Sequence, residues 1–185
     1  SDVERLIEEL ERLLDELRKK TEEIIRRIKK LIDELRRKTE EVIKRLEKLA
    51  RDLTRLTERG SDKEEVDRIL DEIKKRVEKI ERELEETHKK VRRRLEELET
   101  EMEKLHKELK ERIEKLSKEL EDKGTSEEAR RRIDEIRKKA EEVNKESRDR
   151  LRRLKEEVDK VDKDSKRRLD ELREELRRLM EESKR

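Results

Sequence analysis

The sequence predicts an all-α fold, a nearly straight up-down-up three-helix bundle of the coiled-coil type. Apolar residues recur at helical spacing along the whole chain, helix-breaking residues occur at only two places, and the apolar pattern has an 18-residue repeat. Of the 185 residues, 63% are charged and 27% are hydrophobic, a composition that is often typical of disorder. Because the apolar residues are regularly spaced and are separated mainly by Glu, Lys and Arg, the pattern instead favours long amphipathic helices.

Two short segments around Gly60 and Gly124 divide the chain into three parts of similar length. Glycine commonly follows the last residue of a helix because it adopts a left-handed backbone conformation without strain. We expect one domain over residues 1–185, with helices at about 2–59, 63–123 and 127–183 and loops at 60–62 and 124–126. Loops this short make neighbouring helices antiparallel.

A capping box, in which the N-cap residue is followed three positions later by Glu, is predicted at the start of each helix. The three pairs are Ser1 with Glu4, Asp62 with Glu65, and Thr125 with Glu128. In each pair the first side chain would accept a hydrogen bond from a backbone N–H of the first turn that has no partner within the helix.

The repeat is clearest in residues 15–32 and 33–50, which are identical at 12 of 18 positions. Eighteen residues in five turns correspond to 3.6 residues per turn, the period of an α-helix without supercoil, whereas a seven-residue repeat winds left-handed. We therefore expect the helices to run nearly straight, each roughly 85 to 90 Å long at 1.5 Å per residue.

Polar side chains interrupt the apolar stripes, and most of them follow the same 18-residue spacing. When heights are set from the loops, they fall into two groups. The first group is Thr21, His106, Asn144 and Ser147, and the second is Thr39, Thr87, His88, Asp162 and Ser165. Since a buried polar group without a partner costs about 1 to 3 kcal/mol, we expect two buried hydrogen-bond networks. The alternative is that these residues lie at the margins of the stripes and meet water, as the positions of Asn144 and Asp162 allow.

Catalytic and metal-binding functions have little support in the same residues. His88, Asp162 and Ser165 are the three side-chain types of a hydrolase triad, yet no oxyanion donor or strained nucleophile turn accompanies them. His88 and His106 lie five helical turns apart, roughly 27 Å, and zinc at His88 and Asp162 would lack two ligands. We expect no enzyme activity, no cofactor and no metal site.

Composition also limits the expected partners. Lys and Arg number 59 and Asp and Glu number 57, with both signs mixed along the chain and no aromatic residue. Nucleic-acid binding normally needs a face of one sign, and no apolar run exceeds two residues, which excludes a membrane span. The sequence predicts a monomer. A homo-oligomer or a complex with a partner helix, formed through the wide apolar arc of the first helix, remains the alternative.

Charged pairs are expected on the faces opposite the apolar stripes. Glu precedes Arg or Lys by four residues, which is the favourable order on a helix. Examples are Glu22 with Arg26, Glu23 with Arg27, and Glu40 with Lys44. Each exposed pair contributes only tenths of a kcal/mol, so the apolar core is expected to hold the fold.

The regular repeats, three matched helices, loops written GSD and GTS, and a Glu/Lys/Arg surface resemble de novo designed, parametrically generated helical bundles. The stretch LIDELRRKTEEVIKRLEKL is especially similar in style to designs with built-in hydrogen-bond networks. The resemblance covers the whole chain. It implies a very stable structural scaffold, monomeric or self-associating, with no assigned activity, and it carries no functional residues over.

A pH response is the one chemical property that these residues suggest, because a buried histidine titrates near neutral pH. Only His88 is predicted to face a carboxylate, that of Asp162, so His88 and His106 should titrate differently. NMR titration of the two imidazole rings measures this directly, and two matching curves would rule it out.

Overall fold

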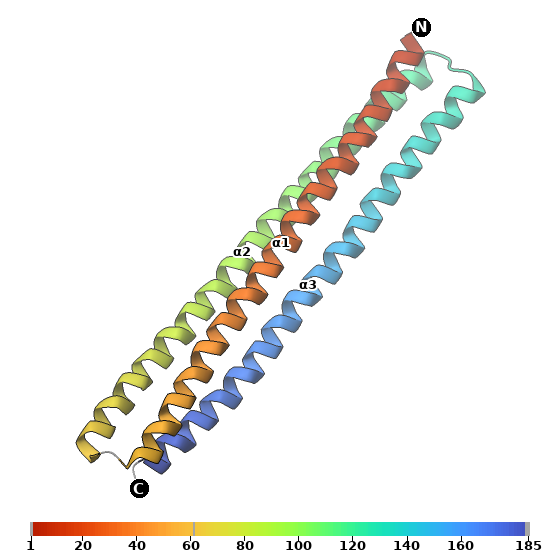
Figure 1. Ribbon diagram of the computed structural model, residues 1–185. Coiled ribbons are helices and arrows are strands. Elements are labelled where there is room, and N and C mark those ends of the chain that lie inside the picture. Colours follow the sequence, from red (N-terminus) through yellow and green to blue (C-terminus); the bar gives the residue numbers. More distant parts are fainter. Residues whose placement is uncertain (1, 61, 184–185) are drawn as a thin grey trace. The chain divides into compact units, whose positions relative to one another are not determined.

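The computed structural model describes residues 2–60 and 62–183 and contains three long α-helices (Figure 1). Helix α1 spans Asp2–Arg59, α2 spans Lys63–Asp122 and α3 spans Glu127–Ser183. No strand occurs within these described residues. The predicted all-α, three-helix fold is therefore confirmed.

The glycines adopt the conformation expected after a helix C-terminus. Gly60 and Gly124 have φ angles of +62° and +69°, values that residues with a Cβ atom rarely adopt. At the end of α2 the amide of Gly124 also donates to the carbonyl of Glu121 at 3.2 Å. Each glycine thus lets the chain leave its helix without backbone strain.

The predicted cap of α3 is wrong by one residue. The hydroxyl of Ser126, not that of Thr125, accepts the amide of Ala129 at 3.2 Å. Because α3 begins at Glu127, this places Ser126 at the N-cap and Ala129 at the third helical position. The Thr125 hydroxyl is buried and finds no hydrogen-bond partner among the described residues.

At the start of α2, Asp62 makes the backbone contact of an N-cap residue. The carbonyl of Asp62 accepts the amide of Val66 at 3.0 Å, as the carbonyl of an N-cap residue does. The capping box predicted at Ser1 lies outside the described residues.

The chain divides into two compact units, and each helix contributes one segment to each unit. Unit 1 contains residues 2–30 and 94–155, and unit 2 contains residues 31–93 and 156–183, with residue 61 left undescribed. In Figure 1, unit 1 comprises the start of α1, the end of α2 and the start of α3. The single domain over 1–185 stays a prediction.

Unit 1 has a continuous apolar core built from all three helix segments. One cluster of this core consists of the buried residues Ile7, Leu10, Leu13, Leu14, Leu17, Leu109, Ile113, Leu120, Ala129, Ile133 and Ile136. Other residues of the unit are buried as well, namely Ile24, Ile25, Ile28, Leu95, Leu98, Met102, Leu151 and Leu154. Burying each of the larger aliphatic side chains stabilises the fold by about 1.5 to 3 kcal/mol. The core, rather than the surface charges, therefore holds this unit together.

Unit 2 has an equivalent core to which α3 contributes less. One cluster of this core consists of the buried residues Val42, Leu46, Leu49, Ala50, Leu53, Val66, Leu70, Ile73, Ile80, Leu84 and Leu176. Leu176 is the buried member of this cluster from α3, and Val158 of α3 is buried elsewhere in the unit. The other α3 side chains packed against it, such as Leu169 and Leu172, are partly buried. Helix α3, which has fewer apolar residues, thus contributes fewer fully buried side chains to this core.

Helix α1 is the most deeply embedded element in both units. Ile7, Ile25 and Ile43, at 18-residue steps, are each no more than 1% exposed. They lie beside the main apolar stripe and widen the buried face of α1. A wide buried face is what a helix needs to contact two neighbours at once.

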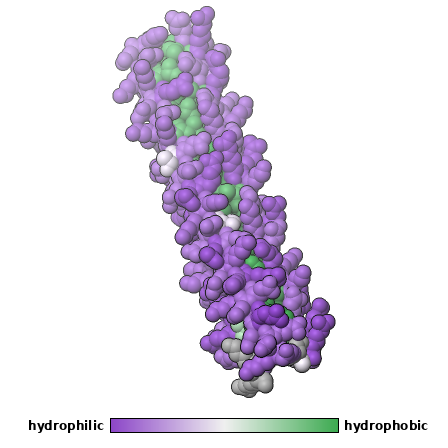
Figure 2. All heavy atoms as spheres, turned by 90° about the vertical axis from the view of Figure 1, so that its left-hand side faces the viewer, coloured by the Kyte–Doolittle hydropathy of each residue, from purple (hydrophilic) through white to green (hydrophobic). Residues whose placement is uncertain are grey.

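Hydrophilic residues cover most of the surface in view in Figure 2, and hydrophobic residues show only in narrow gaps between them. No large hydrophobic side chain is exposed among the described residues. Within the same residues, no helix has the combination of length and apolar character needed to cross a bilayer.

Replacing Gly124 by alanine should lower the free energy of unfolding by about 1 to 2 kcal/mol, the cost of a Cβ atom at a left-handed position. Open space surrounds the glycine, so backbone conformation alone causes the loss. Chemical denaturation measures it. The control is Gly124→Asn, which should lose less because asparagine tolerates this conformation. Equal stability of Gly124→Ala and the parent would contradict the argument.

Candidate functional site

The polar residues predicted from the sequence fall into two groups, one in each unit, which we call layer 1 and layer 2. Layer 1 lies in unit 1 and consists of Thr21, His106, Asn144 and Ser147. Layer 2 lies in unit 2 and consists of Thr39, His88, Asp162 and Ser165. On every helix the corresponding members are separated by one 18-residue repeat, so each layer has the same arrangement except that Asn144 corresponds to Asp162.

In layer 1, His106 joins the other two helices. Its Nε2 lies 2.9 Å from the hydroxyl of Thr21, and its Nδ1 lies 2.9 Å from Oδ1 of Asn144. Thr21 is 3% exposed and His106 8%. All three helix segments of unit 1 are therefore linked through one buried imidazole.

The hydrogen-bond partners define the tautomer of His106. An amide oxygen only accepts, so Nδ1 must carry a hydrogen and donate to Asn144. In the neutral ring Nε2 then accepts the hydrogen of the Thr21 hydroxyl. The neutral imidazole thus uses both of its nitrogens.

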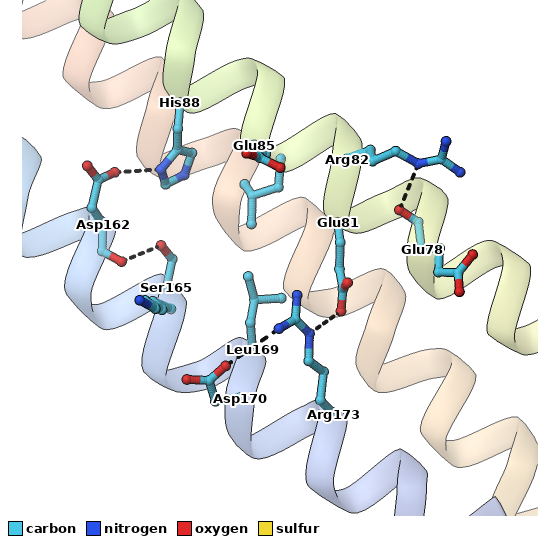
Figure 3. Close-up of a pocket in the computed structure, with 12 residues that line it drawn as sticks. Glu78, Glu81, Arg82, Glu85, His88, Asp162, Ser165, Leu169, Asp170 and Arg173 are labelled. Carbon is cyan, nitrogen blue, oxygen red and sulfur yellow. Dashed lines mark hydrogen bonds and ion pairs between the residues drawn. The ribbon is translucent and has the colours of Figure 1, made fainter.

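In layer 2, His88 and Asp162 point toward one another (Figure 3). Nδ1 of His88 lies 2.5 Å from Oδ1 of Asp162, with side chains that are 16% and 22% exposed. The hydroxyl of Thr39 lies 3.4 Å from Nε2 of His88 and donates to the carbonyl of Leu35 at 2.7 Å. Layer 2 therefore brings the corresponding residues together, but the imidazole and the carboxylate meet as an ion pair, and Oδ1 of Asp162 makes no hydrogen bond among the described residues. The contact to threonine is longer than in layer 1.

An arginine that the sequence reasoning did not single out completes layer 2. Arg92 forms an ion pair with Oδ2 of Asp162 and another with Asp159, at 3.2 Å. Arg92 lies four residues after His88 on α2, one helical turn away. That spacing beside a predicted carboxylate is the signal that could have found it.

The remaining predicted members contact their own helices instead of the rings. Ser147 donates to the carbonyl of Asn144 at 2.8 Å, and Ser165 donates to that of Asp162 at 3.0 Å. Thr87 donates to the carbonyl of Glu83 at 2.9 Å. The structure does not bring Thr87 into layer 2, because its hydroxyl makes an exposed bond to the backbone of α2, whereas the bonds of Ser147 and Ser165 are partly buried.

Ser117 is a buried polar residue that the sequence reasoning missed. It is 0% exposed, and its hydroxyl donates to the carbonyl of Ile113 at 2.7 Å. Ser117 lies outside the 18-residue pattern of the layers. A single small residue at a core position gives no sequence signal that separates it from a small apolar residue.

Burial lowers the pKa of both histidines below the ordinary imidazole value. For His88 the second cause is the positive charge of Arg92. For His106 the hydrogen bond to Asn144 opposes the lowering, and the charge of Arg148 adds to it. Both rings consequently favour the neutral form.

Each layer borders a groove between α2 and α3. The groove beside layer 1 has a volume of about 630 Å³ and that beside layer 2 about 700 Å³. The α3 residues that line the first lie at 144, 147, 148, 151, 152 and 155, and those that line the second lie 18 positions higher. An ion pair spans each groove, Lys155 with Glu99 in the first and Arg173 with Glu81, at 2.5 Å, in the second. The grooves therefore repeat along with the layers.

Ion pairs between α1 and α3 follow the same repeat. Glu4 pairs with Arg132, Glu22 with Arg150, and Glu40 with Arg168. Both partners move by one 18-residue repeat at each step, so the difference between their numbers stays at 128. The hydrogen bond from Arg150 also lowers the pKa of Glu22.

These contacts change the expected surface pairing. Glu23 and Arg27 pair within α1 at 2.9 Å, as predicted. Glu22 and Glu40 instead pair with α3, and Arg26 donates to the backbone carbonyl of Glu22 at 3.5 Å. An arginine on a neighbouring helix offers two parallel donors to a carboxylate. The spacing of residues within one helix does not predict such a pair.

The chemistry available at the layers is hydrogen bonding and proton binding. The Ser165 hydroxyl is directed to the backbone, not to His88, which differs from a nucleophile and its base. Among the described residues, no group of three or more His, Asp or Glu side chains is placed to hold a metal ion.

No family model and no curated protein matches this chain. Among solved structures, the chain is similar to one described as a "Computationally designed three helix bundle". The two share 21% identity over 98% of this chain and 90% of the other, with a TM-score of 0.47.

Replacing Thr21 by valine should lower the free energy of unfolding by about 1 to 3 kcal/mol, since Nε2 of buried His106 loses its partner. Thr100→Val is the matched control, because the exposed Thr100 hydroxyl only donates to the carbonyl of Glu96 in its own helix. Chemical denaturation of both variants gives the comparison. Equal effects of the two substitutions would show that the contact with His106 contributes nothing.

Proposed function

We propose that the chain is a designed structural scaffold, a three-helix bundle in which two buried polar layers specify how the helices meet. The observation that supports this proposal is that contacts between helices, and not only residue types, recur every 18 residues. Layers, grooves and ion pairs between helices all repeat at this interval, as a bundle generated from one geometric rule would require.

The layers have a specific part in the proposed role. Apolar side chains stabilise many rotations of a helix almost equally, whereas a buried hydrogen-bond donor tolerates only the arrangement that gives it an acceptor. His106 needs Thr21 of α1 and Asn144 of α3 at once. A rotation of either helix would leave a buried ring nitrogen unpaired.

We further propose that the scaffold is monomeric. The support is the highly charged outer surface, on which the described residues expose no large hydrophobic side chain. The competing proposal, a self-assembling or partner-binding block, predicts a larger species. Light scattering at micromolar concentration should give the mass of one chain, 22.9 kDa, and a mass of twice this value or more would favour assembly.

A variant without polar layers tests the proposed role. The substitutions are Thr21→Val, His106→Leu, Asn144→Leu, Thr39→Val, His88→Leu and Asp162→Leu, with the surface unchanged. We expect a helical protein of equal or greater thermal stability, because apolar groups replace desolvated polar ones. We also expect it to lose its single arrangement, seen as multiple or broadened amide signals in NMR spectra and as mixed masses in light scattering.

The test has a matched control and a result that would contradict the proposal. An equally large substitution set on the surface, such as six exposed Lys→Arg changes, is the control and should leave one set of signals. A layer-free variant with a single set of sharp signals and the mass of a single chain would overturn the proposal that the layers specify the arrangement.

A further inference from the structure

The two layers differ at the position that faces Nδ1 of the imidazole, which is an amide in layer 1 and a carboxylate in layer 2. We propose that this difference makes unit 1 the acid-sensitive part of the bundle. A proton taken up by His106 has no counter-charge among the groups bonded to the ring, whereas a proton taken up by His88 meets the carboxylate of Asp162.

In layer 1 the neutral ring already uses both nitrogens. Nδ1 donates to Asn144 and Nε2 accepts from Thr21, each at 2.9 Å. A second proton on Nε2 turns this acceptor into a donor, so the Thr21 hydroxyl must turn its hydrogen elsewhere. Protonation of His106 therefore reverses the direction of the bond that joins α1 to the layer, and the hydrogen of the Thr21 hydroxyl then needs a new acceptor.

The charged groups around His106 have both signs, and the two groups bonded to the ring are uncharged. Helix α1 contributes the uncharged Thr21, and α2 contributes Lys110 on the following turn and Glu103 on the preceding turn. Helix α3 contributes Arg148, together with Glu141 and Arg137 in a second cavity that His106 lines with Glu114 of α2. The nearer influence is repulsive, since the charge of Arg148 lowers the pKa of His106. An imidazolium at this place would be a buried and unpaired charge.

In layer 2 both ring nitrogens face acceptors. Oδ1 of Asp162 lies 2.5 Å from Nδ1, and the Thr39 hydroxyl, whose hydrogen goes to the Leu35 carbonyl, presents a lone pair to Nε2. A protonated His88 can donate to both without any hydroxyl turning. The contacts of layer 2 thus need no rearrangement when the ring takes up a proton.

The charges around His88 are mixed. Asp162 and Arg92 lie on α3 and α2, and Glu85 and Lys166 line the adjoining groove. Arg92 shares the carboxylate and opposes protonation. Asp162 nevertheless contacts the ring directly, so the new positive charge lies against a negative one.

The direction of the pH effect follows from the lowered pKa values. The unfolded chain binds protons to both histidines more readily than the folded protein does. The contribution of the two neutral histidines to the free energy of unfolding is therefore fully present above the unfolded pKa of about 6.5. It decreases as the pH drops from there toward the folded-state pKa values. Because layer 1 lacks the counter-charge, the larger part of this loss should occur in unit 1.

Hydrogen exchange of the full chain measures the acid response of each unit separately. The exchange is compared at pH 7.5 and pH 5.5 after correction for the intrinsic exchange rate. Peptides around His106 and Asn144 should show an opening equilibrium constant that rises several-fold on acidification, up to about tenfold, because pH 5.5 lies about one pH unit below the unfolded imidazole pKa. Peptides around His88 and Asp162 should change less. An equal rise in both units would overturn the inference.

Reciprocal exchange of the two residues provides the decisive comparison. Asn144→Asp should raise the pKa of His106 in NMR titrations and remove most of the acid response of unit 1. Asp162→Asn should lower the pKa of His88 and transfer an acid response to unit 2. Lys145→Gln, which changes the net charge by the same amount at an exposed α3 position, is the control and should leave the difference between units intact.

If one exchanged variant fails to fold, the other variant and the parent still test the inference, because hydrogen exchange and NMR titration report on each layer separately. An acid response that stays in unit 1 after Asn144→Asp, or an unaltered pKa of His88 after Asp162→Asn, would show that the residue facing the imidazole does not determine the asymmetry.

Discussion

A helical period of 3.6 residues, maintained by apolar side chains over three helices, is the constraint on which the rest of the structure depends. Because one 18-residue repeat completes five turns, each face of a helix returns to the same direction after it. Ile7, Ile25 and Ile43 are buried to the same extent for this reason. The ion pairs between α1 and α3 recur at a constant difference of 128 because both helices follow the same period.

The polar layers depend on this period as well. A histidine placed at a stripe position of α2 contacts polar partners on α1 and α3 only if all three helices present the right face at that height. The apolar core provides the free energy that keeps the rings desolvated, and desolvation makes their hydrogen bonds selective. Stability and specificity are thus supplied by different residues in the same unit.

Much of the fold could be predicted from sequence because it rests on local signals. Two glycines and the apolar spacing indicate three helices, and heights counted from the two loops place Thr21, His106 and Asn144 near one another. Details that depend on side-chain geometry could not be predicted in this way. Thr87 has the right residue type and approximate height but bonds to its own backbone.

The missed contacts have a common physical origin. Arg92 reaches Asp162, and Arg150 reaches Glu22, through long flexible side chains whose choice of partner depends on the neighbouring helix. Sequence spacing along one helix can suggest Arg92 as a candidate, but it does not show which residue of the neighbouring helix a long side chain reaches. The cap of α3 was misplaced because Thr125 and Ser126 are both good N-cap residues, and only the structure distinguishes them.

The central claim, that contacts between helices recur with an 18-residue period, can be tested by one set of distance measurements. Spin labels on cysteines introduced at 4 and 132, 22 and 150, or 40 and 168 report the α1 to α3 separation by pulsed electron resonance, and the native chain has no cysteine to interfere. The account predicts three narrow distributions with the same mean. Helices that followed a seven-residue period would rotate by about 50° over each repeat. Three different means, or broad distributions, would contradict the claim.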